Sequence, residues 1–397
     1  MFIVREGSIV FRPINISLLR SEEAPLRNRL NERNYTRGSM AFDETVFLTG
    51  FPGFIAGRLL ERLAKDRARF LLLVQPQLLD RAHRELEQLA HETKKPLSDF
   101  HVLKGDITQT DLGLSLTDLE LARSHSTTVF HLAAIYDLAV ARETAIKVNV
   151  GGTRNVNEFV RTIPNIRRYN YVSTCYVAGK RGGPILEAEL RHEAGFRNFY
   201  EESKYLAEVE VDALKSELPV TIHRPSVVCG DSVTGETAKY DGVYYLIQYL
   251  RRWPGLLRLL NIGNHQVTLN LVPVDFVVEA MATLAKDESA VGKTFQLADP
   301  NPLTTHELFN TIGRCLIGKG SRITVPASVV EWSLMLPFSP VVSGLPHHGV
   351  PYFFLKQTYD TAQARELLEP RGVRCPPFPS YAATIVDYVT RHPVLPG

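Results

Sequence analysis

Short apolar runs alternate with amphipathic stretches along the chain from Thr45 onward. Continuous apolar runs predict strands that are buried on both faces, and they occupy residues 46–48, 70–74, 100–103, 128–131 and 169–173. Helical periodicity lies between them, over residues 53–65, 79–92 and 141–159. This alternation predicts an α/β fold, and the right-handed crossover rule makes it a doubly wound parallel sheet of the Rossmann type.

The pattern changes at both ends of this region. After about residue 230, prolines and aromatic residues become frequent, as in 346–354, which predicts a smaller C-terminal substrate-binding lobe. We therefore expect an NAD(P)-binding domain over 40–230 and a mostly substrate-binding lobe over 231–397. Residues 1–39 carry many arginines and turn formers but no lysine, and we interpret them as a disordered extension or an unused upstream start.

Composition excludes several classes of protein. The 397 residues carry 45 basic and 43 acidic side chains, a formal net charge of +2, without the basic patch that a nucleic-acid-binding protein needs. Residues 329–345 are the most apolar late stretch, but Glu331, Pro337 and Pro340 interrupt them, so we expect a buried helix or a channel wall there rather than a membrane span. The four cysteines form no C-x-x-C pair, and His347–His348 has no further ligands nearby. We therefore expect a cytoplasmic protein with reduced thiols and no metal site.

A glycine-containing turn joins the first predicted strand to the first predicted helix. Gly50 suits a tight turn, Gly53 lets backbone N–H groups approach a pyrophosphate, and the following helix N-terminus favours an anion. A plain turn is the alternative, but the strand before it and the helix after it favour dinucleotide binding. The candidate contacts are Thr49, Gly50, Phe51, Pro52, Gly53, Phe54 and Ile55.

The choice of nucleotide depends on the end of the second strand. Residues 73–77 carry no acidic side chain for a ribose 2′-hydroxyl, and Arg58, Arg81 and Arg84 are candidate partners of a 2′-phosphate, which favours NADP(H) over NAD(H). After the third strand, Asp106 and Ile107 are further candidate contacts. Asp106 is suited to accept a hydrogen bond from the adenine amino group, or to cap a helix.

A candidate catalytic set lies downstream. Tyr200 and Lys204 are four residues apart, which places them on one face of a helix, although this spacing alone is usual on exposed helices. A tyrosine with a pKa of about 10 needs a nearby cation before it can exchange a proton near neutral pH. The ammonium of Lys204 is suited to that role and to holding the nicotinamide ribose. Ser173 or Thr174, at the end of a strand, supplies a hydroxyl for the substrate oxygen.

These motifs together resemble the extended short-chain dehydrogenases/reductases over about residues 44–390. The resemblance rests on five features, namely the turn at 49–56, the segment 131–134, the segment 149–153, the Ser173–Thr174 pair and the Tyr200/Lys204 pair. It implies that Ala133 and Ala134 line the cofactor and that Asn149 supports the active site. It also favours Thr174 over Ser173 as the catalytic hydroxyl, with Tyr200 and Lys204 completing the set.

A narrower resemblance is to the male sterility-type branch, which holds fatty-acyl reductases and thioester reductase domains. The runs 223–232, 234–236, 271–277 and 375–377 carry it. It implies that Pro225 and Val227 pack against the nicotinamide. Two positions depart from the pattern: Ala56 replaces the third glycine, and Gln75 stands where related reductases often have arginine.

The resemblance implies reduction of an acyl thioester, carried on CoA or an acyl carrier protein, to aldehyde or alcohol. Local composition predicts an apolar tunnel, with ordinary core packing as the alternative for each residue, from Tyr244, Tyr245, Leu246, Ile247, Leu250, Leu256, Leu257, Leu259 and Leu260. Arg251, Arg252 and Arg258 are either a solvated helix face or a docking patch for CoA or an acidic carrier. Glu187 and Glu189, in a loop before Tyr200, either shape the site or are surface charges, and we expect surface charges. The alternative functions are an NAD-dependent sugar-nucleotide epimerase/dehydratase, a hydroxysteroid-type dehydrogenase, and a non-catalytic dinucleotide-sensing protein.

Overall fold

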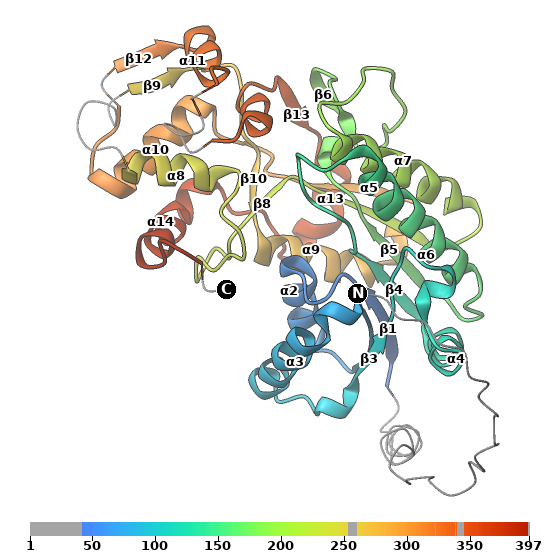
Figure 1. Ribbon diagram of the computed structural model, residues 1–397. Helices are drawn as coiled ribbons and strands as arrows, with labels where there is room; N and C mark the ends of the chain where they lie inside the picture. Colours follow the sequence, from blue (N-terminus) through green and yellow to red (C-terminus); the bar gives the residue numbers. More distant parts are fainter. Residues whose placement is uncertain (1–41, 253–259, 322, 338, 340–344, 396–397) are drawn as a thin grey trace, which may run out of the picture. The chain divides into compact units, whose positions relative to one another are not determined.

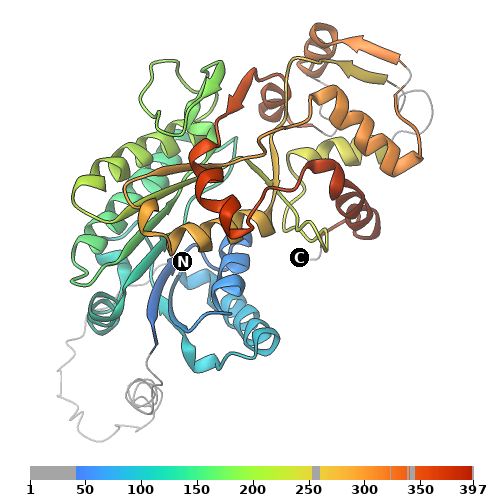
Figure 2. The same ribbon diagram turned by 180° about the vertical axis from the view of Figure 1, so that it is seen from behind.

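The fold is known from a computed structural model that describes residues 42–252, 260–321, 323–337, 339 and 345–395. The predicted extension over 1–39 lies outside these ranges. So do Leu256, Leu257, Arg258 and Leu259, which were expected in the tunnel or the basic patch. The ribbon is shown from two sides in Figures 1 and 2.

A seven-stranded parallel sheet forms the centre of the described chain, in the order β11-β7-β5-β4-β1-β2-β3. The strands are β1 Glu44–Thr49, β2 Ala68–Val74, β3 Phe100–Lys104, β4 Thr128–His131, β5 Arg168–Val172, β7 Val220–Pro225 and β11 Thr294–Leu297. The chain builds outward from β1 to β3 and then returns to the other side of β1 with β4. This reversal between β1 and β4 is the point where doubly wound folds bind nucleotides. The predicted fold class is confirmed.

Helices cover both faces of the sheet (Figure 1). Val46 and Leu48 of β1 pack on one face, with α2 Phe54–Leu63, α3 Leu79–Thr93, α9 Val274–Ala285 and α13 Ala362–Leu368. Phe47, between them, packs on the other face, with α4 Leu116–His125, α6 Gly152–Arg161 and α7 Phe199–Ala213. Because successive strand residues point to opposite faces and both faces are covered, the strands are buried at most positions, polar residues such as His131 and Asn170 included.

The expected helix over 141–159 is divided. It begins with α5 Arg142–Ala145, continues through the π-helical turn η4 Ile146–Gly151, and ends with α6. Two elements beyond residue 230 belong to this region: β11 is a strand of the sheet, and α9 packs on one of its faces. The division of the chain into two domains at residue 230 stays a prediction. The sheet contains strands from both sides of that residue.

The remaining elements form smaller units. Three pairs of short parallel strands are β6 Gly183–Ile185 with β13 Gln357–Tyr359, β8 Val227–Cys229 with β10 Leu271–Pro273, and β9 Leu260–Gly263 with β12 Ile323–Pro326. The other α-helices are α8 Val243–Arg252, α10 Thr305–Ile317, α11 Ala327–Leu334 and α14 Ala382–Arg391. The short 3-10 turns are η1 Pro76–Leu78, η2 Leu97–Asp99, η3 Thr110–Gly113, η5 Cys175–Ala178, η6 Leu214–Ser216, η8 Glu288–Ala290, η9 His347–Phe353, η10 Glu369–Arg371 and η11 Phe378–Ser380.

Three of the side chains considered for an apolar tunnel form part of a packed core, which was the alternative. Tyr244, Ile247 and Leu250 of α8 are at most 1% exposed and pack with residues of α10 and α14. Side chains that fill one another's space leave no channel among themselves. Within the described residues, Tyr244 and Ile247 are therefore core, whereas Leu250 also lines a hollow between α8, α10 and α14.

The stretch 329–345 also differs from expectation. None of the side chains of α11 is buried, and Trp332 is 67% exposed. The helix has eight residues and contacts chiefly β9, β12 and η9, so it has too few neighbours to bury an apolar face. The expectation of a buried helix here was wrong. None of the helices in the described ranges is both long and apolar enough to cross a membrane.

Candidate active site

The turn after β1 has the backbone geometry that a bound phosphate requires. Gly50 has φ +96°, and a Cβ there would lie 2.9 Å from the backbone nitrogen of Ala133. A Cβ on Gly53 would lie 2.6 Å from the carbonyl oxygen of Gly50. Phe51 and Pro52 are buried between the two glycines, and Phe54 and Ile55 begin α2. A cradle that a side chain would fill, opening onto a helix N-terminus, fits the pyrophosphate of a dinucleotide.

Thr49 fastens this turn to the segment after β4. Its hydroxyl accepts hydrogen bonds from the backbone nitrogens of Leu132 (3.2 Å) and Ala133 (3.1 Å). It also contacts Nδ1 of His131 at 2.8 Å. Ala133, half-buried, and Ala134, exposed, are thereby held beside the turn, where the resemblance predicts that they line the cofactor.

The ends of β2 and β3 meet through side chains. Gln75 donates to Oδ2 of Asp106 at 3.1 Å, and the backbone nitrogen of Thr108 donates to Oδ1 of Asp106 at 2.8 Å. Asp106 therefore caps the turn after β3, and Ile107 is buried against Gly152 of α6.

Two of the three arginines considered for a 2′-phosphate are paired with carboxylates. Arg58 pairs with Asp231 and, at 3.0 Å, with Glu61. Arg81 pairs with Glu85 at 2.7 Å. Arg84 is exposed on α3.

Thr174, Tyr200 and Lys204 meet at the carboxyl end of β5. Helix α7 carries Tyr200 and Lys204, and it starts after Asn198, whose side chain accepts a hydrogen bond from the backbone nitrogen of Glu201 at 3.0 Å. The hydroxyl of Thr174 is hydrogen-bonded to that of Tyr200. Burial raises the pKa of Tyr200, whereas the hydrogen bond from Thr174 lowers it. Burial lowers the pKa of Lys204 to about 8, with Glu208 acting in the opposite direction.

The two hydroxyls after β5 have different partners. Ser173 donates to the buried carboxylate of Glu208, which also accepts from Nε of Arg224 at 2.8 Å. Thr174 is the one beside Tyr200. Sequence reasoning missed Glu208 and Arg224. A usable signal existed for Glu208, because it lies one helical turn beyond Lys204 on the same face.

Lys204 and Asn149 are held by buried hydrogen bonds. Nζ of Lys204 donates to the hydroxyl of Tyr171 at 3.0 Å and to the carbonyl oxygen of Val172 at 2.8 Å. Asn149, in the π-helical turn, donates to Oγ of Ser203 at 2.9 Å and accepts from the backbone nitrogen of Ile135 at 2.8 Å. It thus joins α7 to the segment after β4, a supporting position of the kind that the resemblance predicts.

The loop before α7 contains a buried acid that was expected at the surface. Glu187 is 1% exposed and accepts hydrogen bonds from the backbone nitrogens of Gln296 (2.9 Å) and Gln363 (2.6 Å). Burial raises its pKa to about 7. The expectation was wrong for Glu187 because its backbone partners lie more than 100 residues away in sequence. Glu189 is partly exposed and pairs with Arg181.

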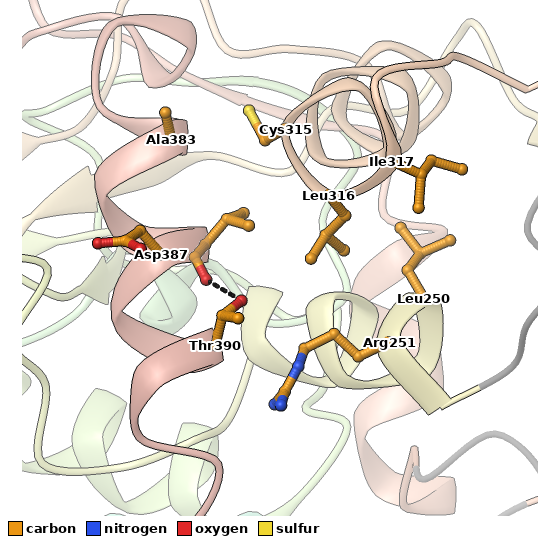
Figure 3. Close-up of a pocket in the computed structure, with 9 residues that line it drawn as sticks. Leu250, Arg251, Cys315, Leu316, Ile317, Ala383, Asp387 and Thr390 are labelled. Atoms are coloured by element: carbon orange, nitrogen blue, oxygen red, sulfur yellow. Dashed lines mark hydrogen bonds between the residues drawn. The ribbon is translucent and has the colours of Figure 1, made fainter.

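Among the hollows of the described structure, two differ in size and place. A cavity of about 10 Å³ is lined by Tyr176, Val227 and Tyr352 among others. Val227 lies two residues after Pro225, the last residue of β7. A hollow of about 410 Å³ lies between α8, α10 and α14 (Figure 3). The candidate catalytic residues do not line it. Arg251 at its edge donates to the carbonyl oxygen of Val389, so this arginine ties α8 to α14.

The comparison with known families decides the classification. Residues 48–281, more than half of the chain, match the family described as male sterility protein. The chain belongs to the male sterility protein family. The family expected from the sequence is confirmed, and the chain carries an NAD(P)-binding domain of the Rossmann type.

Relatives of this male sterility family protein include larger proteins. The fatty acyl-CoA reductase wat of Drosophila melanogaster is 26% identical over 284 residues, which cover 62% of this chain and 54% of the relative. The glycine betaine reductase ATRR of Emericella nidulans is 24% identical over 295 residues, which cover 69% of this chain and 22% of the relative. The chain thus spans at most about half the length of these two relatives.

Solved structures share the architecture. The terminal R domain from the myxalamid PKS-NRPS biosynthetic pathway is 26% identical, with a TM-score of 0.75, and the match covers 90% of this chain and 93% of that one. The UDP-glucuronic acid 4-epimerase from Bacillus cereus, in complex with NAD, is 18% identical with a TM-score of 0.60, over 88% and 97% of the two chains. At that identity, the likeness to the epimerase shows the fold alone.

Proposed function

We propose that this protein is an NAD(P)H-dependent reductase of acyl thioesters. The observation that carries the proposal is the meeting of Thr174, Tyr200 and Lys204 at the carboxyl end of β5, in the sheet whose first turn forms the phosphate cradle. The kind of substrate is supported by family membership, by the fatty acyl-CoA reductase wat and by the R domain of the myxalamid pathway.

The chain's own residues supply the proton and the electrostatic support. When bound, the reduced nicotinamide supplies a hydride to the thioester carbonyl carbon. Thr174 and Tyr200 then donate hydrogen bonds to the carbonyl oxygen as negative charge develops there, and Tyr200 transfers its proton to that oxygen. The ammonium of Lys204 favours the phenolate that Tyr200 becomes. Collapse of the resulting hemithioacetal releases the thiol and an aldehyde, and a second reduction gives the alcohol.

For the cofactor, the finer proposal is NADP(H) rather than NAD(H). The end of β2 offers no carboxylate to a ribose 2′-hydroxyl, because Gln75 stands there and binds Asp106. Since Arg58 and Arg81 pair with acids, Arg84, exposed on α3, is the remaining candidate of the three for a 2′-phosphate. We expect NADPH to bind about tenfold more tightly than NADH, and Arg84→Ala to narrow that gap while Arg81→Ala does not. Equal affinities in the unmodified protein would contradict this choice.

The expected substrate is a thioester on CoA or an acyl carrier protein, used in the cytoplasm. We propose that residues 40–230 mainly bind the cofactor, with Pro225 and Val227 beside the nicotinamide, and that 231–397 mostly receive the acyl group. The cavity of about 10 Å³ beside Val227 has room for about one water molecule.

The deciding experiment measures NADPH and NADH oxidation with acyl-CoAs of increasing chain length and with acyl carrier thioesters. Products are identified by mass spectrometry. We expect thioester-dependent oxidation of the cofactor that yields aldehyde or alcohol, and the dependence of kcat/KM on chain length identifies the preferred acyl group. Tight binding of a UDP-sugar, without NADPH or NADH oxidation in the presence of any thioester, would favour the epimerase over the reductase. Cofactor binding without turnover of any substrate would favour a dinucleotide-sensing protein.

A further inference from the structure

Tyr171 of β5 lies directly against the ammonium of Lys204. The two side chains are 1% and 3% exposed, and Nζ of Lys204 donates to the Tyr171 hydroxyl at 3.0 Å. The same Nζ lies 4.6 Å from the centroid of the Tyr171 ring. The carbonyl oxygen of Val172 is its second acceptor, at 2.8 Å. Since an ammonium has three N–H donors, these two acceptors leave one donor for the cofactor ribose.

Tyr171 is also the first member of a buried hydrogen-bond chain. Its hydroxyl is bonded to that of Thr153, and Oγ1 of Thr153 lies 3.1 Å from Nε2 of His131. Nδ1 of His131 in turn lies 2.8 Å from Oγ1 of Thr49, in the phosphate turn. The chain therefore crosses from β5 through α6 and β4 to β1.

The direction of the hydrogen bonds follows from Thr49. Its two lone pairs accept the N–H groups of Leu132 and Ala133, so its own proton must point to Nδ1 of His131. His131 then carries its proton on Nε2 and donates to Thr153. Burial, together with the nearby Lys204, lowers the pKa of His131 to about 3, so the ring stays neutral near physiological pH. The chain is thus uncharged, and Lys204 is the cation at its end.

We propose that Tyr171 is a positioning residue for Lys204, and that the chain Tyr171–Thr153–His131–Thr49 ties the lysine to the phosphate turn. The proposal rests on the proposed function in one respect, because it assumes that Lys204 binds the nicotinamide ribose. Tyr171 contacts neither the substrate nor the reacting atoms in this account.

Removal of the Tyr171 hydroxyl has a defined electrostatic consequence. A hydrogen-bond acceptor favours the charged form of a lysine, whereas burial opposes it. Among the described residues, the titratable groups that interact with Lys204 are Glu208 on α7, Tyr171 on β5 and His131 on β4, and Tyr200 lies one turn before it on α7. Glu208 and His131 are unchanged in Tyr171→Phe, so the loss of one acceptor should lower the pKa of Lys204 further below about 8.

Tyr169 provides a matched control on the same strand. It lies two residues before Tyr171, is fully buried in the same core, and donates its hydroxyl to Oδ1 of Asn157 at 2.7 Å. Tyr169→Phe removes the same atom and one buried hydrogen bond, but the lost bond is not one that Lys204 makes. An effect that both variants share is caused by the loss of a buried hydroxyl from the core. Only a difference between the two variants is caused by the lost contact with Lys204.

The experiment measures NADPH affinity of the full chain by nucleotide fluorescence, from about pH 6 to about pH 10. We expect the unmodified protein to lose affinity as Lys204 deprotonates, and Lys204→Ala to lack this step. Tyr171→Phe should bind several-fold more weakly and shift the midpoint down by about one pH unit, and Tyr169→Phe should keep the original midpoint. Thr153→Val breaks the chain one link further from the lysine, so it should shift the midpoint in the same direction by a smaller amount. This variant tests the proposal if Tyr171→Phe fails to fold.

Three results would overturn the proposal: equal midpoints in Tyr171→Phe and Tyr169→Phe, a step that survives Lys204→Ala, or no step in the unmodified protein. Thermal unfolding of each variant separates lost binding from lost folding. Because binding needs no turnover, the expected shift in a protein that reduces no thioester would refute the reductase proposal and leave the role of Tyr171 intact.

Discussion

Replacement of Gly50 by alanine should damage both the fold and the phosphate cradle. A non-glycine residue in the left-handed region costs about 1–2 kcal/mol, and Gly50 has φ +96°. The added Cβ would also lie 2.9 Å from the backbone nitrogen of Ala133, which Thr49 holds in place by a hydrogen bond. Because backbone atoms must shift to relieve the contact, we expect a total loss of about 2–4 kcal/mol in the free energy of unfolding.

Gly57 supplies the control, because the same substitution there should have the opposite sign. It lies inside α2, seven residues further along, and a Cβ would meet nothing within 4 Å. Alanine in a helix interior is more stable than glycine by about 0.5–1 kcal/mol, so Gly57→Ala should stabilise the protein.

Urea unfolding of both variants and NADPH titration of the folded proteins test these expectations together. We expect Gly50→Ala to unfold at lower urea. We also expect it to bind NADPH at least about tenfold more weakly, because a displaced turn no longer aims its backbone N–H groups at the pyrophosphate. Gly57→Ala should unfold at higher urea with unchanged affinity. Undiminished stability and affinity in Gly50→Ala would refute the account of the turn.

Two further predictions concern side chains. Tyr200→Phe should lower kcat by about 10²–10⁴-fold and leave NADPH affinity nearly unchanged, because only the proton donor is lost, and steady-state kinetics with a binding titration check this. Burial raises the pKa of Glu187 from 4.5 to about 7, so the folded state favours the protonated form. The stability that protonated Glu187 gives the folded state is fully present below pH 4.5 and is lost as the pH rises to about 7. Glu187→Gln should not show that decline. Parallel plots of Tm against pH for the two proteins would contradict the assignment.

Local patterns were sufficient to predict the sheet. Residues 128–131 were expected as a strand and form β4 with the same bounds. All four residues are buried, and the two central ones, Val129 and Phe130, are apolar. The turn at Gly50 was recognisable for a similar reason. Its glycines are required by backbone contacts within the turn and with the segment after β4, and their spacing in the sequence records that requirement.

The features that could not be predicted depend on contacts distant in the chain. Glu187 was expected at the surface, but its backbone donors come from β11 and the start of α13. Arg58 was a candidate for a phosphate, but its partner Asp231 lies 173 residues downstream. Trp332 was expected to be buried because its segment is apolar, yet burial requires neighbours, which α11 lacks among the described residues. The composition of a segment indicates which side chains it could bury, but it does not indicate which other segments pack against it.

The two hydroxyls after β5 allow the catalytic assignment to be tested within one turn. Thr174 is bonded to Tyr200, so Thr174→Ala should lower kcat and kcat/KM by similar factors, as expected for an interaction made in the transition state. Thr174→Ser should restore most of the rate. Ser173 donates to Glu208, so Ser173→Ala should lower the free energy of unfolding by about 1 kcal/mol with little change in kcat.

The pair of variants separates the two roles because each hydroxyl has a different partner. Glu208 keeps its hydrogen bond from Arg224 at 2.8 Å when Ser173 is changed, so its carboxylate remains paired in the core. If Ser173→Ala instead lost the rate while Thr174→Ala kept it, the substrate oxygen would lie beside Ser173. Ser173 would then have to leave Glu208 during the reaction, and the proposed arrangement of Thr174 and Tyr200 would be wrong.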